Sequence, residues 1–341
     1  MAKILITGGT GYIGSHTVVS LIEQGYEAII IDNLCNSSIE SLDGVEAITG
    51  IRPLFEQIDM QNRASLDDFF YRHADIKAVI HFAALKAVGE SVEKPVEYYR
   101  NNLGSLLNLV ASMQKFSVGN LIFSSSATVY GEPDSLPIME FHPVKPAMSP
   151  YGNTKKICED IISDTARVNK EFHAISLRYF NPIGAHESGF IGELPQGVPN
   201  NLMPFITQTA AGIRKELKVF GDDYDTPDGT AVRDYIHVVD LANAHVKALD
   251  RLMKENQDDN YEVFNLGTGN GFSVLEVIKS FEKTSGLKLP YQIVDRRSGD
   301  VEATYASTTL ANEKLNWKAE RTLDEMTYSS WNWEKKARKM D

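Results

Sequence analysis

Near its start the chain reads Lys3-Ile4-Leu5-Ile6-Thr7-Gly8-Gly9-Thr10-Gly11-Tyr12-Ile13-Gly14, an apolar run that leads directly into a cluster of glycines. The run 3–7 is aliphatic and β-branched and predicts a buried strand. Apolar residues then recur at helical spacing to about Gln24, and Gly25 ends that predicted helix. A second apolar run at 28–31 predicts another strand, which is followed by Asp32. The order is strand, glycine turn, helix, strand and acid.

This order is the pattern of a dinucleotide site, in which an acid follows the glycines by about 20 residues. Glycines let backbone N–H groups approach a pyrophosphate, and the N-terminus of the helix adds a partial positive charge. The carboxylate of Asp32 is suited to accept hydrogen bonds from an adenosine ribose and to repel a 2′-phosphate. The sequence therefore predicts NAD rather than NADP as the cofactor.

Strand and helix patterns alternate through the first 180 residues. Further strands are predicted at 53–58, 78–82, 120–124 and 173–179, with helices at 62–73, 95–116 and 151–169. Repeated βα units with nearly continuous apolar strands indicate a parallel sheet that helices cover on both faces. We therefore expect an α/β fold in which residues 1–180 form a doubly wound, Rossmann-type domain that binds NAD.

From residue 181 the chain becomes rich in loops and short elements. The segment 184–201 has little periodicity and is typical of a long functional loop. Amphipathic helices are predicted from about residue 240, at 273–284 and at 322–333. We expect residues 181–341 to form a smaller α/β substrate domain, parts of which can pack back onto the first.

Composition narrows the class of protein. The 341 residues carry a net charge of −12, which argues against a general nucleic-acid or membrane surface. The two cysteines, Cys35 and Cys158, lie far apart without metal-ligand spacing, so no metal and a reduced, cytoplasmic protein are expected. The sequence has no signal-like start and no apolar run of membrane-spanning length.

A tyrosine and a lysine are spaced for acid–base chemistry in Ser149-Pro150-Tyr151-Gly152-Asn153-Thr154-Lys155. Pro150 is suited to start a helix, and the spacing of four places the Tyr151 phenol and the Lys155 ammonium on one helix face. An unperturbed phenol is a poor base at neutral pH, and a nearby cation lowers its pKa, typically by about 1–3 units. We therefore expect Tyr151 to be a base that Lys155 activates.

Polar residues gather where the predicted strands end. These ends carry Thr7-Gly8, Asp32-Asn33, Asp59, Phe82-Ala83-Ala84, Ser124-Ser125-Ser126 and Phe180-Asn181. Ligands of open parallel sheets bind beyond the carboxyl ends of the strands, so these segments are predicted to line one crevice.

Several motifs extend this pattern along the whole chain, in order. They are residues 7–16, 32–37, 81–91 (His81-Phe82-Ala83-Ala84-Leu85-Lys86 and onward), 124–131, the Tyr151/Lys155 helix, 178–182, 199–204, 233–237 and Arg297-Ser298-Gly299-Asp300. With these motifs the chain resembles the extended short-chain dehydrogenases/reductases and, within them, the branch that epimerises UDP-hexoses at C4.

The resemblance implies a redox-neutral, NAD-dependent interconversion of UDP-glucose and UDP-galactose. Tyr151 would take the proton of the sugar 4-hydroxyl while hydride passes from C4 to NAD. Lys155 would hold the cofactor ribose, and Ser126 would bind the same sugar oxygen and relay the proton. The 4-keto sugar would then rotate and take the hydride back on its other face.

The same resemblance implies two further sets of contacts. Cofactor contacts are expected from Gly8, Gly11, Tyr12, Ile13, Gly14, Asp32, Asn33, Asn36, Ser37, Asp59, Met60, Phe82, Ala83, Ala84, Lys86, Asn101, Ser124, Tyr151, Lys155 and Phe180. Substrate contacts are expected from Ser126, Tyr151, Asn181, Asn201, Leu202, Lys218, Val219, Phe220, Arg233, Arg297, Asp300 and Thr304, with Arg233 and Arg297 as clamps for the diphosphate. The family also implies a homodimer formed through the helices at 95–116 and 151–169.

Three alternatives remain beside this interpretation. A sugar-nucleotide 4,6-dehydratase would need acids after the catalytic hydroxyl, where this chain has Ala127-Thr128. An epimerase for UDP-GlcNAc or for a uronic acid is a second; the uronic-acid enzyme would need a cation aimed at the sugar carboxylate. A non-catalytic NAD-binding regulator is the third, and it would be expected to lose the Tyr151/Lys155 pair.

Thr304 departs from the family pattern. Bacterial members of the family that accept only UDP-glucose and UDP-galactose typically carry a tyrosine four residues beyond the position of Asp300. That tyrosine crowds the 2-position of the sugar. The smaller Thr304 implies that N-acetylated UDP-hexoses are also accepted, unless the neighbouring Tyr305 fills the space or the register slips by one.

Overall fold

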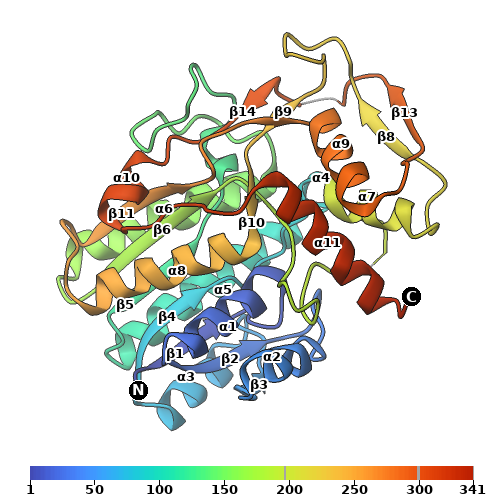
Figure 1. The fold of residues 1–341 in the computed structure, drawn as a ribbon. Helices are drawn as coiled ribbons and strands as arrows, with labels where there is room; N and C mark the ends of the chain where they lie inside the picture. Colours follow the sequence, from blue (N-terminus) through green and yellow to red (C-terminus); the bar gives the residue numbers. More distant parts are fainter. Residues whose placement is uncertain (196, 298–299, 341) are drawn as a thin grey trace.

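The computed structural model describes residues 1–195, 197–297 and 300–340 (Figure 1). Ser298 and Gly299 of the predicted 297–300 motif lie outside the described residues.

A seven-stranded parallel sheet forms the centre of the described chain (Figure 1). Its strands, in spatial order, are β3 (Leu54–Gln57), β2 (Glu27–Asp32), β1 (Lys3–Thr7), β4 (Ile76–His81), β5 (Asn120–Ser124), β6 (His173–Tyr179) and β11 (Tyr261–Leu266). The order reverses between β1 and β4, which creates the switch point at which such sheets bind ligands. The predicted α/β, doubly wound class is confirmed.

Helices cover both faces of this sheet because successive strand residues point to opposite sides. On one face α1 (Tyr12–Glu23), α2 (Ser41–Thr49) and α8 (Val238–Met253) pack on a core that includes Ile4 and Ile6. On the other face α3 (Arg63–Arg72), α5 (Pro95–Lys115) and α6 (Pro150–Val168) pack on a core that includes Leu5.

The second half of the chain surrounds a separate core built from α7 (Leu202–Ala210), α9 (Val274–Ser285) and α11 (Leu323–Ala337). Short strands join it: β7 (Asn181–Ile183) with β10 (Tyr235–His237), β8 (Leu217–Phe220) with β13 (Tyr291–Val294), and β9 (Val232–Arg233) between β12 (Phe272–Ser273) and β14 (Ala303–Thr304). The remaining short helices are α4 (Val88–Glu93), α10 (Thr309–Lys314) and the 3-10 helix η1 (Ala127–Tyr130).

Several elements of the second half belong spatially to the first. β11 extends the large sheet by pairing with β6, and α8 packs against α1. The boundary near residue 180 therefore describes the chain order, and the division into an NAD-binding and a substrate domain stays a prediction. Among the described residues no helix is both long and apolar enough to cross a membrane.

Candidate active site

The glycine turn after β1 forms a cradle of bare backbone. Gly8 has a φ of +72°, and a Cβ on it would lie 2.7 Å from the backbone nitrogen of Ala83. A Cβ on Gly14 would lie 2.3 Å from the carbonyl oxygen of Gly8. Both positions therefore require glycine, and the turn leads directly into the N-terminus of α1, where backbone N–H groups favour an anion.

Asp32 lies at the end of β2 beside this cradle and is 7% exposed. Its carboxylate accepts hydrogen bonds from Thr10 Oγ1 at 2.6 Å, Ser37 Oγ at 3.1 Å and the Leu34 backbone nitrogen at 2.9 Å. Thr10, which the sequence analysis did not select, thus connects the glycine turn to the acid. The glycine turn leaves space that a Cβ would fill, and the oriented Asp32 carboxylate lies beside it. This arrangement fits the pyrophosphate and the adenosine ribose of NAD.

The loop after β4 closes over the cradle. Thr7 Oγ1 and His81 Nδ1 are 2.7 Å apart, and burial lowers the pKa of His81 to about 3, so the imidazole is neutral at pH 7. The side chain of the buried Asn102 accepts from the Leu85 nitrogen at 2.9 Å and donates to Thr154 Oγ1 at 3.0 Å. Asn102 therefore joins this loop to α6.

Helix α6 presents Tyr151 and Lys155 as predicted. Ser149 caps it by accepting from the Gly152 nitrogen at 3.1 Å, and Pro150 is its first residue. Tyr151 is 7% and Lys155 4% exposed, so both functional groups are withdrawn from bulk water.

Lys155 points toward the end of β5. Its Nζ donates to the Ser124 carbonyl oxygen at 2.7 Å and lies 4.8 Å from the centre of the Phe123 ring. Burial lowers the pKa of Lys155 to about 8 because the ammonium loses its hydration.

The expected effect of Lys155 on the pKa of Tyr151 stays a prediction. Burial raises the pKa of the Tyr151 phenol well above its ordinary value, and a hydrogen bond with Ser126 opposes that rise. The loss of phenolate hydration is the largest cause of this rise, and the Lys155 ammonium is directed to the Ser124 carbonyl. Burial therefore disfavours the phenolate form of Tyr151.

Ser126 completes this group of three. It caps η1 by accepting from the Thr128 nitrogen at 3.2 Å, and its Oγ also accepts from Thr128 Oγ1 at 3.0 Å. These contacts orient the hydroxyl next to Tyr151.

Several predicted substrate residues contact one another. Arg233 Nη2 lies 3.8 Å from Asp300 Oδ1, and the Arg297 guanidinium lies 4.6 Å from the centre of the Phe220 ring. Thr304 is the register partner of Arg233 across β14 and β9. These residues, distant in sequence, are thereby brought together.

The remaining predicted substrate residues differ in their environment. The Asn201 amide binds Glu193, and Leu202 is the first residue of α7. Val219 is packed in the core of the second half, whereas Lys218 is exposed and Asn181 is exposed at the start of β7.

On the cofactor side, several predicted residues form hydrogen bonds with other residues of the protein. The pairs are Asn33 with Cys35 and Gln57, Asn36 with Ala84, Asp59 with Gln61, Asn101 with Asn102, Ser124 with Tyr179, and Phe180 with Leu266. Met60 is buried and Ile13 packs against the core. The individual roles of all these residues stay predictions.

Sequence reasoning missed residues that support the site: Thr10, Tyr98, Asn102, Thr154, Glu159 and Glu193. Thr10 bonds the predicted Asp32, and Glu193 contacts the predicted Lys86 and Asn201. The others bond residues next to the predicted ones, which no local motif announces. Among the described residues no group of His, Cys, Asp or Glu has an arrangement that could hold a metal ion.

Comparisons with known proteins agree with this geometry. The family profile of GDP-mannose 4,6-dehydratases matches residues 5–329. A UDP-glucose 4-epimerase of Haemophilus influenzae is 53% identical over 332 residues, which are 97% of each chain.

Two solved structures share the fold over nearly their full lengths. UDP-glucose 4-epimerase from Bifidobacterium longum, in complex with NAD+ and UDP, is 50% identical with a TM-score of 0.94 and coverage of 98% of this chain and 99% of that one. The enzyme from Stenotrophomonas maltophila, with bound NAD and formylated UDP-arabinopyranose, is 47% identical with a TM-score of 0.96 and covers 99% of each chain.

Proposed function

The chain belongs to the GDP-mannose 4,6-dehydratase family of short-chain dehydrogenases/reductases and, within it, to the UDP-glucose 4-epimerases, and from this membership we propose that it interconverts UDP-glucose and UDP-galactose with NAD. The observation that carries the proposal is the convergence of Ser126, Tyr151 and Lys155 at the carboxyl end of β5.

The chain's own residues have distinct tasks toward the cofactor. The backbone of the 8–14 turn would hold the pyrophosphate, Asp32 the adenosine ribose, and Lys155 the nicotinamide ribose. When bound, NAD supplies the oxidation and re-reduction of C4, together with the positive charge that a buried phenolate requires.

Tyr151 would remove the proton of the sugar 4-hydroxyl as general base. Ser126, which is hydrogen-bonded to Tyr151, would bind the same oxygen and pass the proton between them. The burial of Tyr151 and Lys155 excludes bulk water, so a proton held there is available when C4 is reduced again.

Inversion at C4 requires a firm hold on UDP and a loose hold on the hexose. Arg233 and Arg297 would bind the diphosphate, and Phe220 and Asp300 would contact the uridine side. The 4-keto sugar can then rotate about its diphosphate link and present its other face.

The surroundings of Ser126 argue against dehydration, the activity named by the matching family profile. Elimination of water needs an acid next to the catalytic hydroxyl, whereas Ala127 and Thr128 follow Ser126, and the Thr128 hydroxyl donates to Ser126 Oγ. The structure thus supplies a hydrogen-bond donor where a dehydratase needs a carboxyl group.

The experiment that tests this function follows UDP-galactose with the purified protein and measures UDP-glucose formation without added oxidant. Mass analysis of the compound released on denaturation identifies the cofactor. We expect both epimerisation and NAD; release of NADP, or an absence of UDP-glucose, would reject the proposal.

We also propose that UDP-GlcNAc and UDP-GalNAc are substrates. The Tyr305 ring lies against Gly271, where a Cβ would be 3.3 Å from Tyr305 Cδ1, so this ring is engaged with the neighbouring segment. That contact supports Thr304, with its small side chain, as the residue beside the sugar 2-position.

Finally, we propose a cytoplasmic homodimer. Both cysteines are free, as suits a reducing compartment. Helix α5 exposes Val96 and Leu107, at 68% and 51%, and a Cβ on Gly104 would meet open space. Exposed apolar residues on a helix are suited to self-association, and light scattering on the purified protein measures the mass that decides it.

A further inference from the structure

Glu193 joins two predicted parts of the site. Its Oε1 accepts a hydrogen bond from Asn201 Nδ2 at 2.9 Å and lies 3.3 Å from Lys86 Nζ. Lys86 is on the loop after β4, a predicted cofactor segment, and Asn201 precedes α7 on the substrate side. One carboxylate oxygen therefore contacts a predicted cofactor segment and a predicted substrate segment.

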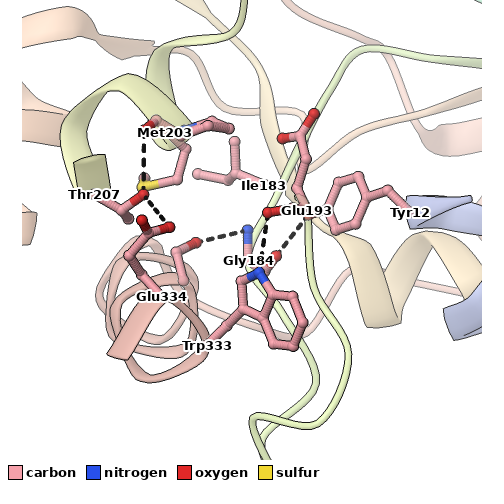
Figure 2. A pocket seen from close by; sticks show the side chains of 10 residues that line it. Tyr12, Ile183, Gly184, Glu193, Met203, Thr207, Trp333 and Glu334 are labelled. Carbon is pink, nitrogen blue, oxygen red and sulfur yellow. Dashed lines mark hydrogen bonds between the residues drawn. The ribbon is translucent and has the colours of Figure 1, made fainter. Parts of the chain in front are cut away.

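A contact with α11 holds the backbone at Glu193, and a second contact holds Gly184 earlier in the same segment (Figure 2). Trp333 Nε1 donates to the Glu193 carbonyl oxygen at 3.0 Å, and the Tyr12 hydroxyl donates to the Gly184 carbonyl oxygen at 2.6 Å. Gly192 lies so close to the Trp333 ring that a Cβ would be 2.3 Å from it. The cavity that Figure 2 shows here has a volume of about 10 Å³, too small for a hexose.

The Lys86–Glu193 pair lies near the dinucleotide cradle. Lys86 Nζ lies 5.9 Å from the centre of the ring of Tyr12, the first residue of α1. The loop that carries Lys86 also supplies Ala83, whose backbone lies against Gly8. The ion pair therefore lies beside the start of α1, next to the turn that would hold the pyrophosphate.

We propose that Glu193 is a positioning residue that holds Lys86 beside the cofactor cradle and couples it to Asn201; this rests on the proposed function. Lys86 has a long side chain that is 56% exposed. Without the ion pair to Glu193, this side chain would populate many rotamers. The Glu193 side chain, 12% exposed and held by its own backbone contacts, restricts that spread.

The coupling follows from the shared oxygen. Any movement of Asn201 on substrate binding changes the same carboxylate that fixes Lys86. Retention of the cofactor and binding of UDP-hexose are thus connected through Glu193.

The test measures the rate at which the holoprotein exchanges bound NAD for labelled NAD. Glu193→Gln keeps an acceptor for Asn201 and removes the charge facing Lys86, so exchange should accelerate by about fivefold at low salt, the upper range for a partly exposed ion pair. The Michaelis constant for UDP-galactose should change by less than about twofold, whereas Glu193→Ala, which also breaks the Asn201 bond, should raise it.

Lys86→Met should accelerate exchange at least as much as Glu193→Gln, because it also removes the expected cofactor contact of Lys86. The double variant should exchange NAD at the rate of Lys86→Met, since Glu193 acts through Lys86. Glu187→Gln makes the same charge change on an exposed residue of the same loop and should leave exchange unchanged. Unaltered exchange in Glu193→Gln, or additive effects in the double variant, would overturn the proposal. Exchange is measured without catalysis, so a wild type that epimerises and holds NAD separates this failure from failure of the proposed function.

Discussion

Glu159 and Arg178 form a buried ion pair beneath the catalytic helix, with 2.5 Å between Glu159 Oε2 and Arg178 Nη2 and both side chains 7% exposed. Glu159 Oε1 also accepts from Ser125 Oγ at 2.5 Å. Glu159 lies one turn beyond Lys155 on α6, while Ser125 precedes Ser126. The pair therefore fixes the Ser126 segment relative to the helix that carries Tyr151 and Lys155.

We predict that Arg178→Leu lowers the free energy of unfolding by about 3–5 kcal/mol, because Glu159 is left buried without its cation. The exposed pair Arg167–Asp164 on the same helix provides the control, since Arg167→Leu should cost less than about 1 kcal/mol. Urea unfolding measures both. Equal, small effects would show that the buried pair does not fix the helix.

Tyr151→Phe should preserve the fold and lower kcat by about 10²–10⁴-fold, since the ring still packs but the general base is gone. Tyr71→Phe removes a hydroxyl from a residue that is 75% exposed and should have wild-type turnover. Steady-state kinetics with UDP-galactose, combined with circular dichroism, checks this. Near wild-type turnover in Tyr151→Phe would end the mechanism.

Lys155→Met should lower activity and raise stability at pH 7. Burial lowers the pKa of Lys155 from its ordinary value of 10.5 to about 8. The unfolded chain therefore binds more protons between about pH 8 and 10.5, and wild-type stability rises with pH across that window. Below pH 8 the full penalty for the buried ammonium is present. The variant removes this penalty but also loses the hydrogen bond to Ser124. We therefore expect its free energy of unfolding to be about 2 kcal/mol higher than that of wild type.

Urea unfolding without added cofactor, at pH 7 and pH 10, measures this difference, which should shrink at the higher pH. A variant that is less stable than wild type at both pH values would show that burial of the Lys155 ammonium does not destabilise the folded protein.

Thr304→Tyr should restrict substrate breadth. A bulkier residue beside the sugar 2-position should lower kcat/KM for UDP-GalNAc by about tenfold or more, since one misfitting group costs a few kcal/mol. The value for UDP-galactose in the same variant is the control and should change little. If wild type does not turn over UDP-GalNAc, or the tyrosine variant loses none of that activity, Thr304 does not limit the substrate.

Much of the fold was predictable because its signals are local. The strands at 3–7, 120–124 and 173–179 have the observed bounds, and α6 begins at Pro150 as its proline indicates. In contrast, α2, α7 and β11 were not predicted. β11 depends on a partner, β6, that lies far away in the sequence, and its short, mixed run has little pattern of its own.

The sequence by itself determined the residue types and spacings of the chemistry: the glycine turn, Asp32, Ser126, and Tyr151 four residues before Lys155. These are local relations along a strand, turn or helix. Only the tertiary structure decided the direction of each side chain and the pKa of each ionisable group. Lys155 is directed to the Ser124 carbonyl, and the pKa of Tyr151 rises, because burial acts through every atom packed around the site. The meeting of Lys86, Glu193 and Asn201 depends likewise on three segments that only folding brings together.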